Sequence, residues 1–321
     1  MTTTRRALAL GSLAMLPTLR GAAAQATWPT RPVSIVVAFA AGGAVDTLAR
    51  MLGQTLSDQG GGTFVVDNRV GGGGTVSAAH VARAQPDGHT LLMMTSSHAV
   101  NETLATNRGY ELLRDLRPIA QFAATPYWLA VRPDRATSLA ELLEKAEREP
   151  MTFATGGPGG LTHLLGEMLK QETKLELTSV HYRGNAPAIT DLLAGRVDMI
   201  FDNSGTILEH IKSGRLRGLA STTRRRLAST PEVPAMAELG FPQFDVSAWI
   251  GLAAPAGTPD PVVERIAAEV RRALEDEAFR ERIAGTGAEV AYLGPAEFGA
   301  LVQREIPRWA QVIRAGNVTV N

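Results

Sequence analysis

Two segments of this chain, one in each half, place an apolar strand pattern, a glycine-containing loop and an amphipathic helix pattern in direct succession. The first joins the apolar run 35–39 to the loop 40–43, and the second joins 151–154 to the loop 155–160. The first N–H groups of a helix have no intrahelical partner and carry partial positive charge, and glycines let an anion come close to that backbone. The repetition predicts two lobes that hold one small anion between them.

One polar side chain follows each loop in the first turn of the predicted helix. Asp46 follows the first loop, where it would complement the helix dipole, orient the loop or receive a group of the ligand. His163 follows the second loop, where it would contact the ligand, fix the loop or pack as an ordinary histidine. Both are candidate site residues, and the sequence leaves these roles open.

Composition narrows the possible functions. The 321 residues are enough for two lobes, and a formal net charge of zero gives no broad basic field for nucleic acid. The chain has no cysteine, which excludes disulfides, a thiolate nucleophile, cysteine-ligated zinc and a lipid anchor on cysteine. None of the six histidines stands three or four residues from another, so no metal or other cofactor is expected.

The N-terminus has the pattern of an export signal. Arg5 and Arg6 precede the apolar stretch 7–16, and small residues gather over 22–26 in an A-x-A cleavage pattern. The apolar stretch is too short to cross a bilayer as a helix. We predict that residues 1–26 are a signal peptide, compatible with the general or the twin-arginine route, and that the mature chain is a soluble periplasmic protein. An N-terminal helix of the folded protein is the alternative.

Strand and helix patterns alternate along the mature chain, which predicts α/β lobes with mostly parallel sheets flanked by helices. The extended run 122–131 leads out of the first lobe and the strand pattern 216–221 leads back, so crossings are expected near Ala124 and Ser221. Lobe 1 is predicted to comprise residues 27–124 and 235–321, and lobe 2 residues 125–234. The helical patterns 261–275 and 295–315 would cover lobe 1.

Polar residues stand where several predicted strands end. Ligands collect at the carboxyl ends of parallel strands, where hydroxyl and amide groups can bind carboxylate oxygens. Asp202 would select an amine or a hydroxyl group on the ligand, or cap a helix. The predicted ligand-binding residues are Phe39, Ala41, Gly42, Gly43, Asp46, Ser96, Ser97, Thr155, Gly156, Gly157, His163, Tyr182 and Asp202.

An enzyme of the doubly wound α/β type is the competing hypothesis. The first loop lacks the G-x-G-x-x-G spacing of a dinucleotide site, and the second lacks the lysine of a phosphate-binding loop. The chain has no G-x-S-x-G motif for a nucleophilic serine, and H-E-x-x-H is absent. Because neither a cofactor fingerprint nor an acid–base pair is evident, a binding protein without catalytic residues is favoured over an enzyme.

Several short motifs, taken in order, closely resemble the receptors of the tripartite tricarboxylate transporters, the Bug-type periplasmic proteins. They include the Ala-Gly-Gly of the first loop, a run of four glycines and a Tyr-Arg-Gly after a strand. The resemblance extends over essentially the whole mature chain. The motifs are 28–32, 39–46, 67–69 with 71–74, 86–92, 181–184, 192–195, and Trp249 with 254–259.

This resemblance implies a two-lobed periplasmic binding-protein fold of the type II-like class with two crossing strands. It implies that a small organic carboxylate is captured between the lobes, often with ordered water, by the loops 39–46 and 155–163. Delivery to a membrane permease would follow, or signalling to a sensor partner as the alternative, and the receptor would act as a monomer. The chain departs from the family pattern at Ala44, Glu102 and Gly160, where the family usually has proline, proline and serine.

Overall fold

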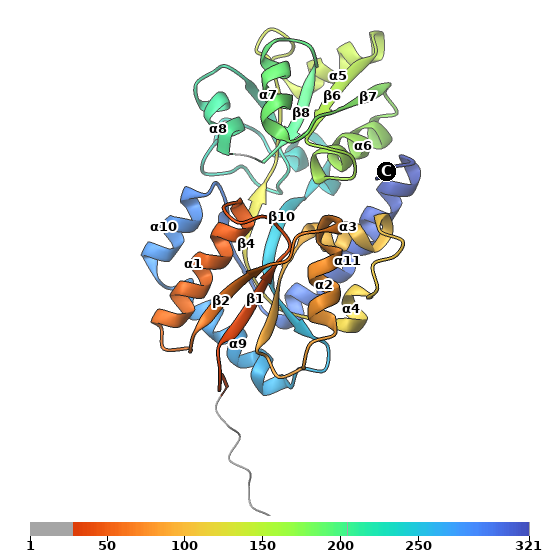
Figure 1. The fold of residues 1–321 in the computed structure, drawn as a ribbon. Coiled ribbons are helices and arrows are strands. Elements are labelled where there is room, and N and C mark those ends of the chain that lie inside the picture. Colours follow the sequence, from red (N-terminus) through yellow and green to blue (C-terminus); the bar gives the residue numbers. More distant parts are fainter. Residues whose placement is uncertain (1–27, 204, 321) are drawn as a thin grey trace, which may run out of the picture.

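The computed structural model describes residues 28–203 and 205–320. The predicted signal peptide, residues 1–26, lies outside the described residues. None of the helices in the described part of the chain combines the length and the hydropathy of a membrane-spanning segment. Two β-sheets, each flanked by helices, make up the fold, with the smaller sheet above the larger in Figure 1.

The larger sheet has six strands in the order β11-β4-β10-β3-β1-β2. Strands β1 and β2 and strands β1 and β3 pair in parallel, as the alternation of strand and helix predicts. The pairs β3–β10, β10–β4 and β4–β11 are antiparallel. The strand bounds are β1 Val33–Val37, β2 Phe64–Asn68, β3 Thr90–Thr95, β4 Leu116–Pro126, β10 Ser247–Pro255 and β11 Glu289–Leu293.

The smaller sheet has five strands in the order β7-β6-β8-β5-β9. Strand β6 pairs in parallel with β7 and β8, whereas β5 runs antiparallel to β8 and β9. The two-sheet α/β fold class is confirmed. Both sheets are mixed rather than mostly parallel, because the strands next to the crossings pair with their neighbours in antiparallel orientation. The bounds are β5 Trp128–Val131, β6 Met151–Thr155, β7 Leu177–His181, β8 Met199–Asp202 and β9 Arg217–Ser221.

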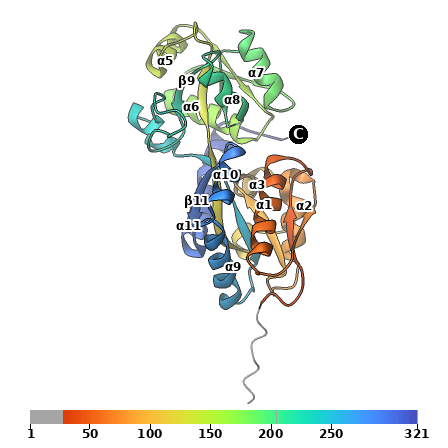
Figure 2. The same ribbon diagram turned by 90° about the vertical axis from the view of Figure 1, so that its left-hand side faces the viewer.

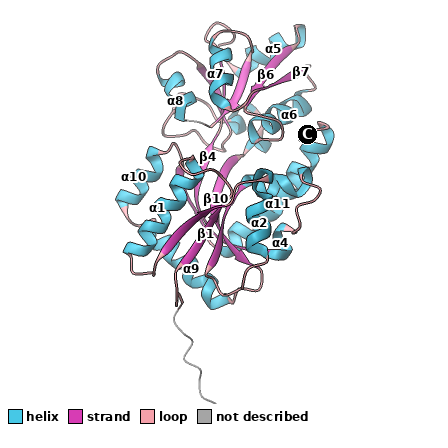
Figure 3. Ribbon diagram, viewed as in Figure 1, coloured by secondary structure: helices cyan, strands magenta, loops and turns pink. Residues whose placement is uncertain are grey.

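Helices cover both faces of the larger sheet, as Figures 2 and 3 show. One face packs against α1, α9 and α10, and the other against α2, α3 and α11. The smaller sheet carries α5, α6, α7 and α8, and α4 precedes β4. The bounds are α1 Ala44–Asp58, α2 Thr75–Ala82, α3 Ser96–Leu104, α4 Leu112–Asp115, α5 Leu139–Arg148, α6 Leu161–Thr173, α7 Asn185–Leu193, α8 Gly205–Lys212, α9 Asp260–Ala273, α10 Glu277–Gly285 and α11 Pro295–Ala315.

The chain passes from β4 to β5 at Tyr127 and returns to β10 through the segment 222–246. Thr222 is fully buried at this junction, where its Oγ1 accepts the N–H of Tyr127 at 3.0 Å and donates to the carbonyl oxygen of Val246 at 2.7 Å. One hydroxyl group therefore links the first connection, at Tyr127, to both ends of the second connection. The domain boundaries at 124 and 235 stay a prediction, because sheet membership assigns the strands and not the connecting residues.

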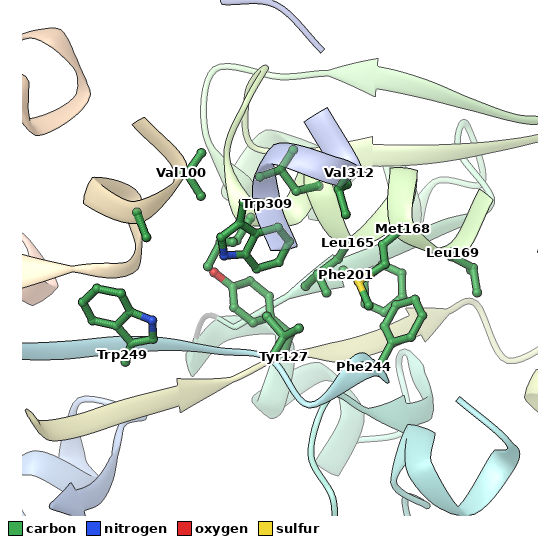
Figure 4. Packing of buried hydrophobic residues seen from close by; sticks show 14 of the residues in the cluster. Val100, Tyr127, Leu165, Met168, Leu169, Phe201, Phe244, Trp249, Trp309 and Val312 are labelled. Carbon is green, nitrogen blue, oxygen red and sulfur yellow. The ribbon is translucent and has the colours of Figure 1, made fainter. Parts of the chain in front are cut away.

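Helix α11 contacts both halves of the molecule. It packs on α3 and β4 of the larger sheet, and it also contacts α6 beside the smaller sheet. Figure 4 shows Trp309 and Val312 of α11 next to Leu165 and Met168 of α6. The apolar core is thus continuous across the junction. The sequence pattern predicted that α11 covers lobe 1 only, whereas the helix contacts both halves of the molecule.

Candidate functional site

The first glycine loop is held from inside by Asp46, whose side chain is 2 % exposed. Its Oδ2 accepts the N–H of Gly42 at 2.8 Å and the Nε–H of Arg50 at 3.0 Å. Its Oδ1 accepts from Nδ2 of Asn68 at 2.8 Å, and the same amide donates to the carbonyl oxygen of Phe39. Asp46 therefore orients the loop between β1 and α1, which is one of the three roles that the sequence left open.

Asp46 is held in its charged form. Burial by itself raises the pKa of this carboxyl group, but hydrogen bonds from Arg50, Gly42 and Asn68 outweigh it and lower the pKa from 3.8 to about 2. A permanent negative charge just inside the α1 N-terminus offsets part of the helix dipole there. The loop is therefore well ordered, at the expense of some of its attraction for anions.

The second loop is held in the same way by His163, whose side chain is 7 % exposed. Its Nδ1 accepts the N–H of Gly159 at 3.1 Å, and its Nε2 lies 3.7 Å from Oε1 of Glu167. The His181 ring packs edge-on against it with a centroid separation of 4.6 Å. Burial and the neighbouring His163 lower the pKa of His181.

Most glycine N–H groups of the two loops already donate to acceptors within the protein. Gly43 donates to the carbonyl oxygen of Ala40 at 3.2 Å, Gly156 to Oγ1 of Thr162 at 3.0 Å, and Gly157 to Oγ1 of Thr155 at 3.2 Å. A Cβ at Gly156 would lie 2.0 Å from Oδ1 of Asn185, so a larger residue there would displace the Asn185 side chain. These glycines shape the loops, and they are not the free donors that the sequence predicts.

In the part of the chain that the structure describes, backbone N–H groups without a protein acceptor follow each loop, at the first two residues of the helix. Gly43 and Gly160 are the N-cap residues of α1 and α6, with the same extended backbone and no side-chain cap. Among the described residues, no protein acceptor pairs with the N–H groups of the next two residues in each helix. These four donors belong to Ala44, Val45, Leu161 and Thr162.

The predicted site residues at the strand ends differ in their burial and in their hydrogen-bond partners. Ser96 is buried and Ser97 is half-buried at the start of α3. The hydroxyl group of Tyr182 donates to Oδ2 of Asp191 at 2.9 Å, and burial together with this contact raises the pKa of Tyr182. Asp202 is fully buried, and its Oδ1 accepts from Nδ2 of Asn185 at 2.6 Å and from the N–H of Asn203. Tyr182 and Asp202 thus have structural partners, and their ligand contacts stay a prediction.

A cavity of 610 Å³ lies between the two halves of the molecule. Two of the predicted site residues, Phe39 and Ser97, line it. Three others, Ala41, Gly42 and Asp46, line a separate hollow of 530 Å³ together with Arg50 and Arg282. The remaining predicted residues line neither space; they are Gly43, Ser96, Thr155, Gly156, Gly157, His163, Tyr182 and Asp202.

Most of the cavity wall was missed by the sequence analysis. Helix α3 and the single turn Gly72–Gly74 supply the wall on one side, the start of α6 supplies the other, and Val320 closes it. The four glycines 71–74 all have positive φ angles, a conformation that other residues rarely adopt. In the sequence, this run of four glycines was the one feature that could have indicated this wall. The missed residues include Gly72, Gly73, Val100, Asn101, Leu104 and Val320, whereas Pro158, Gly159, Gly160 and Leu161 lie in the loop 155–163 that the family resemblance implies.

The described residues contain no group of three or more His, Asp or Glu side chains that could hold a metal ion. The chemistry of the site in this part of the chain consists of backbone N–H groups, hydroxyl and amide groups and apolar side chains. Such a set can bind and orient a small anion.

Comparison with known proteins assigns the family. A family model described as "Tripartite tricarboxylate transporter family receptor" matches residues 48–318. The protein BugT of Bordetella pertussis is 36% identical over 293 residues, which cover 90% of each chain.

Solved structures agree with this assignment. The periplasmic binding protein BugD is 36% identical, with a TM-score of 0.72 over 91% of this chain and 99% of that one. R. palustris Rpa4515 with adipate and MatC from Rhodopseudomonas palustris with bound malate are each 33% identical, with TM-scores of 0.75 and 0.71. They cover 91% and 89% of this chain and 99% and 100% of their own. The chain belongs to the tripartite tricarboxylate transporter receptor family, the Bug-type periplasmic binding proteins.

Proposed function

We propose that this protein captures a small organic carboxylate between its two lobes and delivers it to a tripartite tricarboxylate-type membrane permease. The observation that carries the proposal is the cavity between the lobes, which is lined at the start of α6 by Leu161, whose N–H group has no acceptor among the described residues. A carboxylate there would accept charge-assisted hydrogen bonds, each contributing about 1.5–3 kcal/mol net. Two relatives are named with bound adipate and malate, which supports this ligand class.

The two loops are suited to holding a ligand because they are ordered before it arrives. Asp46 and His163 each fix a loop glycine, so little backbone freedom remains to be lost on binding. Closure of lobe 2, residues 125–234, on lobe 1 would exclude water from the carboxylate. Among the predicted site residues, Phe39 and Ser97 line the cavity, which supports their proposed contact with the ligand.

A thermal-shift screen of ligand-stripped protein against dicarboxylates, amino acids and aromatic acids tests this proposal. A ligand present at one hundred times its Kd stabilises the folded state by about 2.7 kcal/mol, which gives a clear rise in Tm. The matching alcohols and amides serve as controls, because they fill similar space without the charge. A flat response to every acid, or an equal response to acids and amides, would contradict carboxylate recognition.

We further propose that the chain is exported and works as a monomer in the periplasm after removal of residues 1–26. Cell fractionation and mass determination of the mature N-terminus test the export. Pull-down with the membrane subunits of a tripartite permease, with and without ligand, tests the partner. A protein retained in the cytoplasm at full length would contradict the transport role.

A further inference from the structure

Resting on the proposed function, we infer that Leu104, Gly159 and Val320 form an apolar contact that holds the two halves of the molecule around the bound carboxylate and slows its release. Leu104 is the last residue of α3, which packs beside the larger sheet, and Val320 follows α11. Gly159 lies between β6 of the smaller sheet and α6. All three residues line the cavity between the halves, and we call them the interlobe contact.

Gly159 is the point at which the loop of the smaller half meets the other two segments. An ideal Cβ at this position would lie 2.6 Å from Cγ1 of Val320 and 2.7 Å from Cδ1 of Leu104. The backbone of the loop therefore packs directly against two apolar side chains, and a side chain at position 159 would have to displace them. The φ angle of +74° at this residue also favours glycine.

Each side of the interlobe contact is fixed within its own half. The N–H of Gly159 donates to Nδ1 of His163 at 3.1 Å, so the loop moves together with α6. Val318 is buried in the apolar core and its N–H donates to the carbonyl oxygen of Ile313 at 3.0 Å, which ties the segment 318–320 to α11. A movement of one half relative to the other therefore changes the distance between Gly159 and its partners.

The two halves also approach each other at a second place. A Cβ at Gly287, which precedes β11, would lie 3.7 Å from N and Cα of Gly205 at the start of α8. Figure 1 shows α8 and α10 on the left of the molecule, and α6 with the segment after α11 on the right. The halves thus touch on both sides. We assign the retention of the ligand to the apolar side because its three residues line the cavity.

A contact that exists in one arrangement of two lobes and is broken in another shifts the population towards the first arrangement. In the arrangement described here, Phe39 and Ser97 from one half and Leu161 from the other line a single cavity. The interlobe contact stabilises this arrangement, so a larger fraction of the molecules is able to surround a carboxylate and the apparent Kd is lower. Because the contact has to break before the halves separate, it also slows the escape of a bound acid.

Spin labels measure the arrangement of the halves without any ligand. The chain has no cysteine, so Val76→Cys in α2 and Thr190→Cys in α7 introduce one exposed labelling site in each half. Gly159→Ala places a methyl group in the interlobe contact and is expected to lengthen the mean distance between the labels. Adding Val320→Ala makes room for this methyl group and is expected to restore the distance.

Gly214→Ala is the matched control for Gly159→Ala. Its φ angle of +72° imposes the same backbone strain on alanine, but among the described residues nothing lies within 4 Å of its Cβ position. We expect the label distance in Gly214→Ala to equal that of the unchanged protein. Any difference between the two alanine variants then comes from the interlobe contact.

Stopped-flow tryptophan fluorescence of the mature, ligand-stripped protein measures retention, with adipate or malate as the probe, whichever binds more tightly in the screen. We expect Gly159→Ala to raise the dissociation rate about tenfold over Gly214→Ala, and Val320→Ala alone to raise it about two- to threefold. In the Gly159→Ala background, Val320→Ala is expected to lower the rate, because it removes the collision. This reversal separates the interlobe contact from simple strain in the loop, which a change at Val320 would not relieve.

The outcomes of these measurements are distinguishable. Equal label distances and equal dissociation rates in Gly159→Ala and Gly214→Ala would overturn the inference and leave the proposed function standing. A rate that Val320→Ala failed to lower in the Gly159→Ala background would likewise overturn it, since strain in the loop would then explain the effect. Failure of every acid in the screen would contradict the proposed function and the retention role with it, whereas the label distances would still decide whether the interlobe contact holds the halves.

Discussion

The Nδ1 atom of His163 accepts a hydrogen bond from the backbone N–H of Gly159, four residues earlier, at 3.1 Å. The Oδ2 atom of Asp46 stands in the same relation to Gly42 in the other lobe, at 2.8 Å. Each loop therefore has one internal brace, a hydrogen bond from a glycine N–H to the side chain four residues later. That side chain is an imidazole in one lobe and a carboxylate in the other. Each brace fixes a glycine that precedes an uncapped helix N-terminus.

Replacing His163 tests the brace of the second loop. His163→Leu removes the acceptor and is expected to weaken carboxylate binding about tenfold, since one buried hydrogen bond contributes about 1 kcal/mol or more. His163→Asn is expected to retain most of the affinity, because an amide oxygen can accept the Gly159 N–H. Titration calorimetry with the best acid from the screen is the measurement. Equal affinity of both variants and the unchanged protein would show that the brace does not support binding.

Replacing Asp46 by asparagine should produce a pH-dependent loss of stability. The pKa of Asp46 is lowered from 3.8 to about 2 in the folded state, so the carboxylate stabilises the fold above pH 3.8 and loses this effect as the pH falls through about 2. A lowering of this size corresponds to about 2 kcal/mol. The difference in the free energy of unfolding between the unchanged protein and Asp46→Asn should therefore shrink between pH 4 and about 2.

Urea denaturation across that pH range measures the difference. Asp46→Asn keeps the shape of the side chain and removes only its titration, so other acidic groups cancel in the comparison. A difference in the free energy of unfolding that stayed constant with pH would indicate that folding does not lower the pKa of Asp46.

Thr222→Val tests the junction of the two connections between the sheets. The substitution keeps the side-chain shape, but it leaves the N–H of Tyr127 without its acceptor and the carbonyl oxygen of Val246 without this donor. Since the site is fully buried, we expect a loss of about 1–3 kcal/mol in the free energy of unfolding. Thr222→Ser keeps the hydroxyl group and should lose less. Similar losses for both variants would point to packing of the methyl group instead.

Gly166→Ala tests how closely α6 packs on its sheet. A Cβ at Gly166 would lie 2.1 Å from Cε2 of Phe153, which is fully buried, so a loss of about 1–3 kcal/mol is expected. Gly299→Ala in α11 is the matched control, since nothing lies within 4 Å of its Cβ position. It should stabilise the protein by about 0.5–1 kcal/mol through helix propensity. Chemical denaturation of both variants measures these changes in the free energy of unfolding. No loss of stability in Gly166→Ala would contradict the close packing.

Local patterns predicted many elements well. The helical pattern 295–315 coincides with α11, and the strand patterns before both glycine loops coincide with β1 and β6 to within two residues. Helix α10 and strand β11 were not predicted, because α10 is short and highly charged and β11 exposes two of its five residues. The alternation of strands and helices suggested parallel pairing, but neighbours such as β4 and β10 come from distant parts of the chain and run antiparallel.

The two glycine loops, the helices that follow them and the family could be predicted from the sequence, because they depend on residues close together in the chain or on motifs in order. Which backbone donors are free could be seen only in the folded molecule. Whether Gly42 or Gly159 has an unpaired N–H depends on where the side chains of Asp46 and His163 settle, and packing determines that. The cavity wall likewise depends on the meeting of four distant segments, α3, the Gly72–Gly74 turn, the start of α6 and Val320, and no local pattern records such a meeting.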